Sequence, residues 1–327
     1  MQISVSSDEV ALIDARIAGT VDALSPVLTN KEYLKIFHDC REDSAALYHQ
    51  FGGIRMRGVF DTQAVSLLLQ RSRKITPLHQ QGYTDLVRLY GVSTEDMNDT
   101  ALKQKMSEDA ELWYRRPLTK ELVDYAVAGV KFLVPLYERM SKQLDKVSPS
   151  AITEACDSWV DYCDLNPELS KPADVEKIGL PVMGMVAAIN DRGVYFKLNI
   201  GRTGVCCTPS ALKRMLMGGR NFAPVQVGDT VELSVSGISL DGRTIYVDRR
   251  DPDWEYFDFF RRPSPGKKEI GEYLHVPSIV ESGEDIDPLL RRGLGLDGTV
   301  DSDGEDEVDH EPILTRKPTK NRLDSSF

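Results

Sequence analysis

Two aspartates that each stand at the start of a helical pattern are the first candidates for chemistry in this sequence. Asp43 lies within HDCREDS, and Asp61 lies within VFDTQ. An acid in the first turn of a helix complements the helix dipole, and one just before that turn caps free backbone N–H groups. Taken alone, the residues predict a first-turn acid at Asp43 and a helix cap at Asp61.

Histidines, arginines and cysteines give weaker signals. His38 and His49 lack a partner at the spacing of a metal site or a catalytic triad, so we interpret both as structural. Arg115 and Arg116 precede Pro117 and could either contact phosphate or stay solvated. The five cysteines are an odd, scattered set without the paired spacing of a zinc site. They favour a reduced, intracellular setting, so we expect a cytoplasmic or nuclear protein.

The elements that must position these residues alternate along residues 1–145. VALIDA and LKIFHDC are typical of strands, and the pattern from Ser44 to Gln50 predicts a helix that Gly52 and Gly53 end. Another helix is predicted in VFDTQAVSLLLQ, and LTKELVDYAVAGVKFLVPLYERM predicts one long amphipathic helix. Strands that alternate with helices indicate an α/β fold for this region.

The amino-acid composition and hydrophobic pattern change after this first region. Residues 146–176 turn polar and carry prolines, which predicts a linker. Short β-rich runs, punctuated by NDRG and LDGR, fill residues 177–262 and predict a small all-β barrel. Residues 263–327 are rich in glycine and acids and mostly lack apolar periodicity, which predicts an acidic, disordered tail.

The acidic character of the chain is concentrated near its end. The formal net charge is −11, but residues 281–310 hold eleven acids against two arginines, so the remainder is near −2. The bulk charge therefore does not exclude a nucleic-acid partner. The sequence has no run of eighteen apolar residues, and its start lacks a basic segment followed by an apolar block. We expect neither a membrane partner nor a secretory signal.

Three blocks of the first region together resemble the DEDDy 3′–5′ exonucleases, such as RNase D and the exonuclease-domain-containing relatives of Egalitarian. They are LKIFHDCREDSAALYHQFG, VFDTQ and LWYRRPLTKELVDYAVAGVKFLVPLY. The resemblance implies an RNase H-like fold, a mixed sheet with flanking helices, over residues 1–145. It also implies four carboxylates that hold two divalent ions, Mg²⁺ or Mn²⁺, one to activate water and one to stabilise the leaving oxygen.

The resemblance assigns catalytic roles to two residues of the first region. Asp43 matches the metal ligand of the second motif, and Tyr125 matches the tyrosine that orients the attacking water in the third. The family has an aspartate four residues after this tyrosine, on the same helix face. Here that position is Gly129, which offers no ligand.

Two explanations stay open for the incomplete set of carboxylates. The first motif should lie upstream of Gln2, because Asp8 and Glu9 fall in a turn between strand-like segments and look solvated. A gene model truncated before that motif would account for the missing pair but not for Gly129. Alternatively, the protein has lost catalysis, needs no metal cofactor, and has kept the groove. Gly129 favours loss, because it lies inside the matched block.

Two further blocks resemble the opening and closing halves of an S1-type OB domain. They are PVMGMVAAINDRGVYFKLNIGRTGVCC and FAPVQVGDTVELSVSGISLDGRTIYVDRR. The resemblance implies that Tyr195 stacks on bases, with Lys197 and Arg192 as nearby charges. Arg192 stands where the family usually has an aromatic residue, and Cys206-Cys207 where it often has a polar contact. The alternative is an OB domain used for protein contact.

The resemblances together predict a nucleic-acid-binding protein with a degenerate exonuclease domain. Its ligands would be single-stranded RNA or DNA, with RNA favoured, and its protein partners would belong to a complex for RNA processing or transport. An active metal-dependent 3′–5′ exonuclease is the second hypothesis, and a purely protein-binding scaffold is the third.

Overall fold

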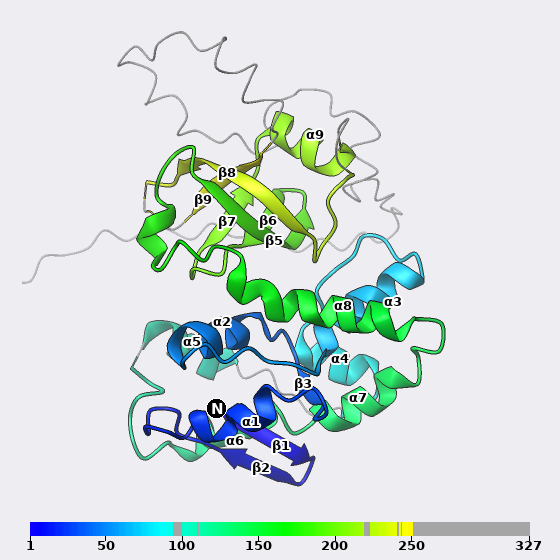
Figure 1. Cartoon of the computed structure of the whole chain (residues 1–327), viewed down its shortest axis with the longest axis vertical. Coiled ribbons are helices and arrows are strands. Elements are labelled where there is room, and N and C mark those ends of the chain that lie inside the picture. Colours follow the sequence, from blue (N-terminus) through cyan, green and yellow to red (C-terminus); the bar gives the residue numbers. More distant parts are fainter. Residues whose placement is uncertain (94–99, 110, 219–222, 241, 243, 251–327) are drawn as a thin grey trace, which may run out of the picture. The chain divides into compact units, whose positions relative to one another are not determined.

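Four short strands in the first region pair as two separate sheets in the structure, which is a computed structural model (Figure 1). It describes residues 1–250, except 94–99, 110, 219–222, 241 and 243. Strands β1 (Gln2–Ser6) and β2 (Glu9–Leu12) form an antiparallel hairpin, whereas β3 (Lys35–Phe37) and β4 (Val59–Asp61) pair in parallel. Helix α7 (Leu133–Ser141) contacts both β1 and β3.

The first region contains the helices predicted at 44–50 and after VFDTQ, together with others that the sequence did not predict. They are η1 (Asp22–Leu24), α1 (Ser25–Leu28), α2 (Arg41–Gln50), α3 (Thr62–Ser72), α4 (Tyr83–Leu89), α5 (Thr100–Glu108), α6 (Lys120–Ala128) and α7. The single helix predicted over 118–140 is wrong, because α6 ends at Gly129 and α7 begins four residues later. Glycine is a poor helix former, and the Gly129 N–H bonds the carbonyls of Tyr125 and Val127, as at a helix end.

Residues 146–176 contain three helices, one face of which is buried, where the sequence predicted a linker. Helix α8 (Pro149–Val160) is capped by Ser148, whose hydroxyl accepts the N–H of Ala151. The short helices η2 (Asp161–Asp164) and η3 (Pro172–Val175) follow it. Helix α8 packs on α3, β4 and α2 of the first region, so these residues belong to the core.

A closed five-stranded barrel follows, as the β-rich runs predicted. Its strands are β5 (Pro181–Asn190), β6 (Gly193–Lys197), β7 (Thr203–Cys206), β8 (Thr230–Ile238) and β9 (Ile245–Arg249), with α9 (Pro209–Met217) between β7 and β8. The order around the barrel is β5-β6-β7-β9-β8, closed by pairing of β8 with β5. Gly193, the first residue of β6, is required, because a Cβ atom there would lie 2.5 Å from the Cys206 carbonyl oxygen.

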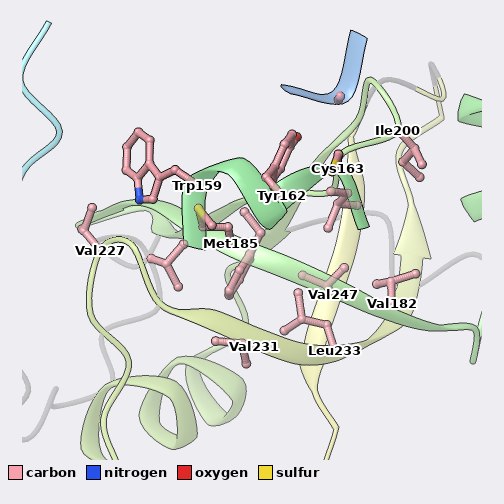
Figure 2. Close-up of a cluster of buried hydrophobic side chains, with 14 of the residues drawn as sticks. Trp159, Tyr162, Cys163, Val182, Met185, Ile200, Val227, Val231, Leu233 and Val247 are labelled. Carbon is pink, nitrogen blue, oxygen red and sulfur yellow. The ribbon is translucent and has the colours of Figure 1, made fainter. Parts of the chain in front are cut away.

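One hydrophobic cluster joins the barrel interior to α8 and η2. Trp159, Tyr162 and Cys163 are at most 2% exposed and belong to the same cluster as Met185 and Leu233 (Figure 2). The cluster also includes Cys40 and Leu47 of the first region. The first region and the barrel therefore share one hydrophobic core and are not separate domains joined by a linker. The predicted tail, 263–327, and the last residues of the predicted second domain, 251–262, lie outside the described residues.

Candidate nucleic-acid interface

Asp43 stands in the first turn of α2, next to two other aspartates. The residue is exposed, yet the surrounding protein partly desolvates its carboxyl, and the carboxylates of Asp39 and Asp61 face it. Both effects raise the pKa of Asp43 above its ordinary value. The negative charges of Glu42 and Asp43 also suit the helix N-terminus, so the first-turn role predicted from the residues agrees with the structure.

Asp61 is the cap of α3, as the sequence predicted. Its side chain is fully buried, and one carboxylate oxygen accepts the N–H groups of Gln63 and Ala64 at 2.9 and 3.0 Å. The other oxygen accepts the N–H of Cys40 at 2.7 Å. Three backbone donors therefore hold this carboxylate in place and tie the end of β3 to the start of α3.

Tyr125 packs against another aromatic ring in the first region. It lies half-buried on α6, with its ring centroid 6.4 Å from that of Trp113. The fourth residue after it, Gly129, is exposed at the end of the helix. Among the described residues, the nearest non-adjacent atoms to a Cβ at Gly129 would be the carbonyl oxygens of Ala126 at 3.4 Å and Tyr125 at 3.8 Å, so an aspartate would fit there.

The donor set of this region does not fit the pair of divalent ions that the resemblance implies. Within the part of the chain that the structure describes, no three acidic, histidine or cysteine side chains are placed to hold a metal ion. Asp61, the buried carboxylate beside Asp43, is already held by three backbone N–H groups. Two divalent ions held in register require several oxygen ligands that converge.

Arg115 and Arg116 each bond a carboxylate of this protein. The Arg115 guanidinium lies 2.6 Å from Asp109, and Arg116 lies 2.9 Å from Asp14. Asp14 also pairs with Arg16 at 2.7 Å, and this guanidinium, followed by that of Arg116, holds the pKa of Asp14 well below its usual value. A phosphate group would have to compete with these exposed pairs for either arginine.

Tyr195 faces outward from the barrel, as strand alternation predicted. Its neighbours on β6, Val194 and Phe196, are fully buried in the interior, whereas Tyr195 is half-buried. Arg192 is exposed in the preceding turn, where its N–H donates to Asn190. These two residues are the part of the predicted cluster that the barrel presents to solvent.

Lys197, two residues beyond Tyr195, pairs with carboxylates of the first region. Its Nζ lies 3.2 Å from Asp39 Oδ2 and 3.5 Å from Glu42 Oε1. The Lys197 ammonium is one cause of the lowered pKa of Asp39, after the side chain of Arg41 and against a desolvation that raises it. The resemblance implies that Lys197 is a nucleic-acid-binding charge near Tyr195, and in the structure Lys197 lies at the contact between the barrel and the first region.

Arg41 is the central residue of that contact, and sequence reasoning missed it. Its guanidinium is fully buried, stacks 3.9 Å from the centre of a Trp159 ring, and bonds Asp39 at 2.5 Å. Further hydrogen bonds reach Gln63 and Gln80, and a weaker one reaches the Met185 sulfur at 3.6 Å. No sequence signal separates a buried arginine at a helix start from a solvated one.

A second polar network fastens η2 to the barrel. The Tyr162 hydroxyl accepts the N–H of Asn199 at 2.7 Å and donates to Glu42 at 3.2 Å. Asn166, 1% exposed, donates to the carbonyls of Met183 and Leu198, and its own oxygen accepts the Met183 N–H. Burial, together with the Glu42 carboxylate, raises the pKa of the Tyr162 hydroxyl, so it stays protonated.

Comparison with known proteins agrees with the resemblance of the first region. Residues 1–145 match the family described as 3′-5′ exonuclease. Ribonuclease D of Nitrobacter hamburgensis is 30% identical over 142 residues, which make up 43% of this chain and 33% of that protein. The human piRNA biogenesis protein EXD1 is 32% identical over 124 residues, 35% of this chain and 23% of that protein. The chain thus spans a third or less of the length of these relatives.

One solved structure is similar to part of this chain. The Trypanosoma brucei RNase D in complex with RNA U12 is 25% identical, with a TM-score of 0.39. The similarity covers 47% of this chain and 52% of that one.

Proposed function

We propose that this chain, whose first 145 residues carry a 3′–5′ exonuclease domain similar to that of ribonuclease D, binds single-stranded RNA without cutting it. In this proposal the exonuclease-like domain and the barrel hold one strand together, and the chain serves as an adaptor in RNA processing or transport with protein partners. The observation that carries the proposal is Gly129, which ends α6 at the position where the family's third motif has a carboxylate. Within the matched second and third motifs, Asp43 is the position that keeps a carboxylate.

The charge of the barrel supports nucleic acid as its ligand. Residues 177–250 contain ten lysines and arginines against five acids, a net charge of +5, although the whole chain carries −11. A small closed five-stranded barrel is the architecture of OB domains, which bind single strands through exposed aromatic residues beside basic groups. Tyr195 and Arg192 supply that combination here, and Lys197, Arg115 and Arg116 could add to it on release from their carboxylates.

A nuclease assay run beside a binding assay tests the proposal on the whole chain. With Mg²⁺ or Mn²⁺, labelled single-stranded RNA should lose no nucleotides above background, and Asp43→Ala should behave identically. Filter binding should detect the same RNA, with an affinity that falls as salt rises, because phosphate contacts release counterions. Metal-dependent release from the 3′ end, abolished by Asp43→Ala, would overturn the non-cutting part. Absence of RNA binding at low salt would overturn the proposal that the chain binds RNA.

An active metal-dependent 3′–5′ exonuclease is the second candidate, and one observation favours it. Strands β1 and β3 belong to separate sheets among the described residues, yet both contact α7. A further strand that carries the first-motif carboxylates could pair with the free edge of each. The test is to search the DNA upstream of Met1 for an in-frame strand with the pattern D-x-E. If this strand exists, the extended chain should be assayed with Gly129 and with Gly129→Asp. In the present chain, Gly129→Asp alone should restore no activity.

A further inference from the structure

We infer that the corner of the first region where α3, α4 and α7 end binds the phosphate backbone of RNA, apart from the matched exonuclease motifs and from the barrel. The inference deepens the proposed function and rests on it, because it names a place where the chain would hold the strand. Five exposed cations form this surface, which we call the basic corner: Arg73, Lys74, Arg139, Lys142 and Lys146.

Hydrogen bonds bring the ends of the three helices together. Arg73, the residue that follows α3, donates to the side-chain oxygen of Gln143, just past the end of α7, at 2.5 Å. Arg139, in the last turn of α7, donates to the carbonyls of Tyr90 and Gly91, which follow α4, at 2.8 and 2.5 Å. Two guanidinium groups therefore join the three ends.

Three lysines extend this surface. Lys74 follows Arg73 directly, and Lys142 and Lys146 stand on either side of Gln143 in the chain. In the view of Figure 1, α3, α4 and α7 lie on one side of the first region, and α2 and α6, which carry the matched motif residues, lie on the other. The basic corner is thus distinct from the site to which the resemblance points.

The cations of the basic corner are not paired with acids. Among the described residues, Arg73 and Arg139 bond a neutral amide and two carbonyls, and no carboxylate pairs with the three lysines. The arginines Arg115 and Arg116, by contrast, each lie on a carboxylate. Arg71, which pairs with Asp229, is not counted in the corner for the same reason.

Helix dipoles account for only part of this positive charge. The C-terminal end of a helix carries roughly half a negative charge, so three ends supply about −1.5. Among the described residues beside the five cations, Glu138 and Asp145 add two negative charges. Positive charge is left over at an exposed surface, where it can attract an anion.

The residue types favour RNA over an acidic protein as this anion. Lysine is depleted at protein–protein interfaces, which need a desolvated apolar core, whereas lysine and arginine supply contacts to phosphates. The large exposed apolar side chains nearby are Leu89 and Ile75, 64% and 42% exposed, and single apolar residues are ordinary on a surface. Arg71, two residues before Arg73, donates to the Val227 carbonyl of the barrel, so a strand that leaves the barrel can continue onto the corner.

Binding of a labelled oligouridylate to the full chain, measured at several salt concentrations, tests the basic corner. Lys74→Gln combined with Lys142→Gln removes two phosphate contacts, so the slope of log affinity against log salt should fall by about 1.4. The affinity at low salt should fall at least about four-fold. The thermal melt should stay that of the wild type, because neither lysine makes a hydrogen bond or ion pair among the described residues.

A matched variant removes the same net charge elsewhere in the first region. Lys105→Gln combined with Lys120→Gln takes away lysines that already pair with Glu121 and Asp124, so slope and affinity should match the wild type. Equal losses in both double variants would mean that net charge alone acts, and the basic corner would be wrong.

Further outcomes separate this inference from the proposed function. If the wild type binds the RNA but Lys74→Gln with Lys142→Gln keeps the slope and the affinity, the corner is wrong and the proposed function stands. If that variant keeps its RNA affinity but loses binding of labelled poly-glutamate, the corner takes an acidic protein segment, which also overturns the inference. If the wild type binds no RNA at low salt, the proposed function fails and the corner with it.

Discussion

The exonuclease-like region and the barrel use their polar and aromatic residues in opposite ways. In the first region, Asp61 caps a helix, Tyr125 packs on Trp113, and Arg116 pairs with Asp14. In the barrel, strand alternation leaves Tyr195 and Tyr246 on the outside, beside an excess of positive charge. The comparison teaches that side chains of the matched exonuclease blocks are engaged by contacts within the protein, whereas the outer face of the barrel keeps aromatic and basic residues accessible.

The largest expected effect comes from cutting the two regions apart after residue 145. The fragment 1–145 would lose α8, whose Cys156, Trp159 and Val160 are buried against it, and would expose the edges of two short sheets. We expect this fragment to aggregate or to melt without cooperativity, while residues 1–250 melt sharply. Size-exclusion chromatography and a thermal scan measure the difference. A sharp, reversible melt of 1–145 would mean that α8 is dispensable for the first region.

The second prediction concerns the buried guanidinium that joins the regions. Arg41→Met should lower the free energy of unfolding by about 3 kcal/mol, because it leaves buried acceptors such as Gln63 unpaired. Arg55→Met is the matched control. The Arg55 side chain is 36% exposed and pairs with Asp161, so its loss should cost less than about 1 kcal/mol. Urea unfolding at neutral pH compares the two. Equal effects would show that the Arg41 cluster does not hold the regions together.

The smallest expected effects distinguish Lys197 from Arg192. Lys197→Met removes the charge that faces Asp39 and Glu42, so we expect a loss of stability of about 1 kcal/mol or less and little change in RNA affinity. Arg192→Met should leave the melt unchanged and weaken RNA binding about two-fold. The slope of log affinity against log salt should fall by about 0.7, the value for one phosphate contact on a single strand. The reverse pattern would place Lys197 on the RNA and Arg192 in the fold.

Helix capping, helix-ending glycines and strand alternation were predictable, because each depends on residues that are close in the sequence. The cap at Asp61, the end of α2 at Gln50 before two glycines with positive φ, and the outward direction of Tyr195 all follow from a few adjacent residues. The barrel was predictable from short β-rich runs separated by turns. The separation of α6 from α7 was not predicted, because the apolar pattern continues across Gly129 while the backbone does not.

Features that depend on distant partners could not be predicted from the sequence. The apolar spacing of Cys156, Trp159, Val160 and Cys163 was an available signal for a buried helix, but the nearby prolines and polar residues favoured a linker. Nothing near Lys197 indicates that Asp39 will face it, since the two lie 158 residues apart. The alignment of Tyr246 with Tyr195 likewise requires the register of β7 with β9, which only the closed barrel defines.

The sequence separation between Arg41 and Met185 also determines how long after Arg41 the contact between them can form during translation. The two residues are separated by 144 positions in the chain. At roughly 5–20 residues added per second, Arg41 waits about 7–30 s on the ribosome before Met185 exists. The other partners of Arg41, which are Asp39, Gln63, Gln80 and Trp159, all precede Met185 in the chain, so its contact with the barrel is the last to become available.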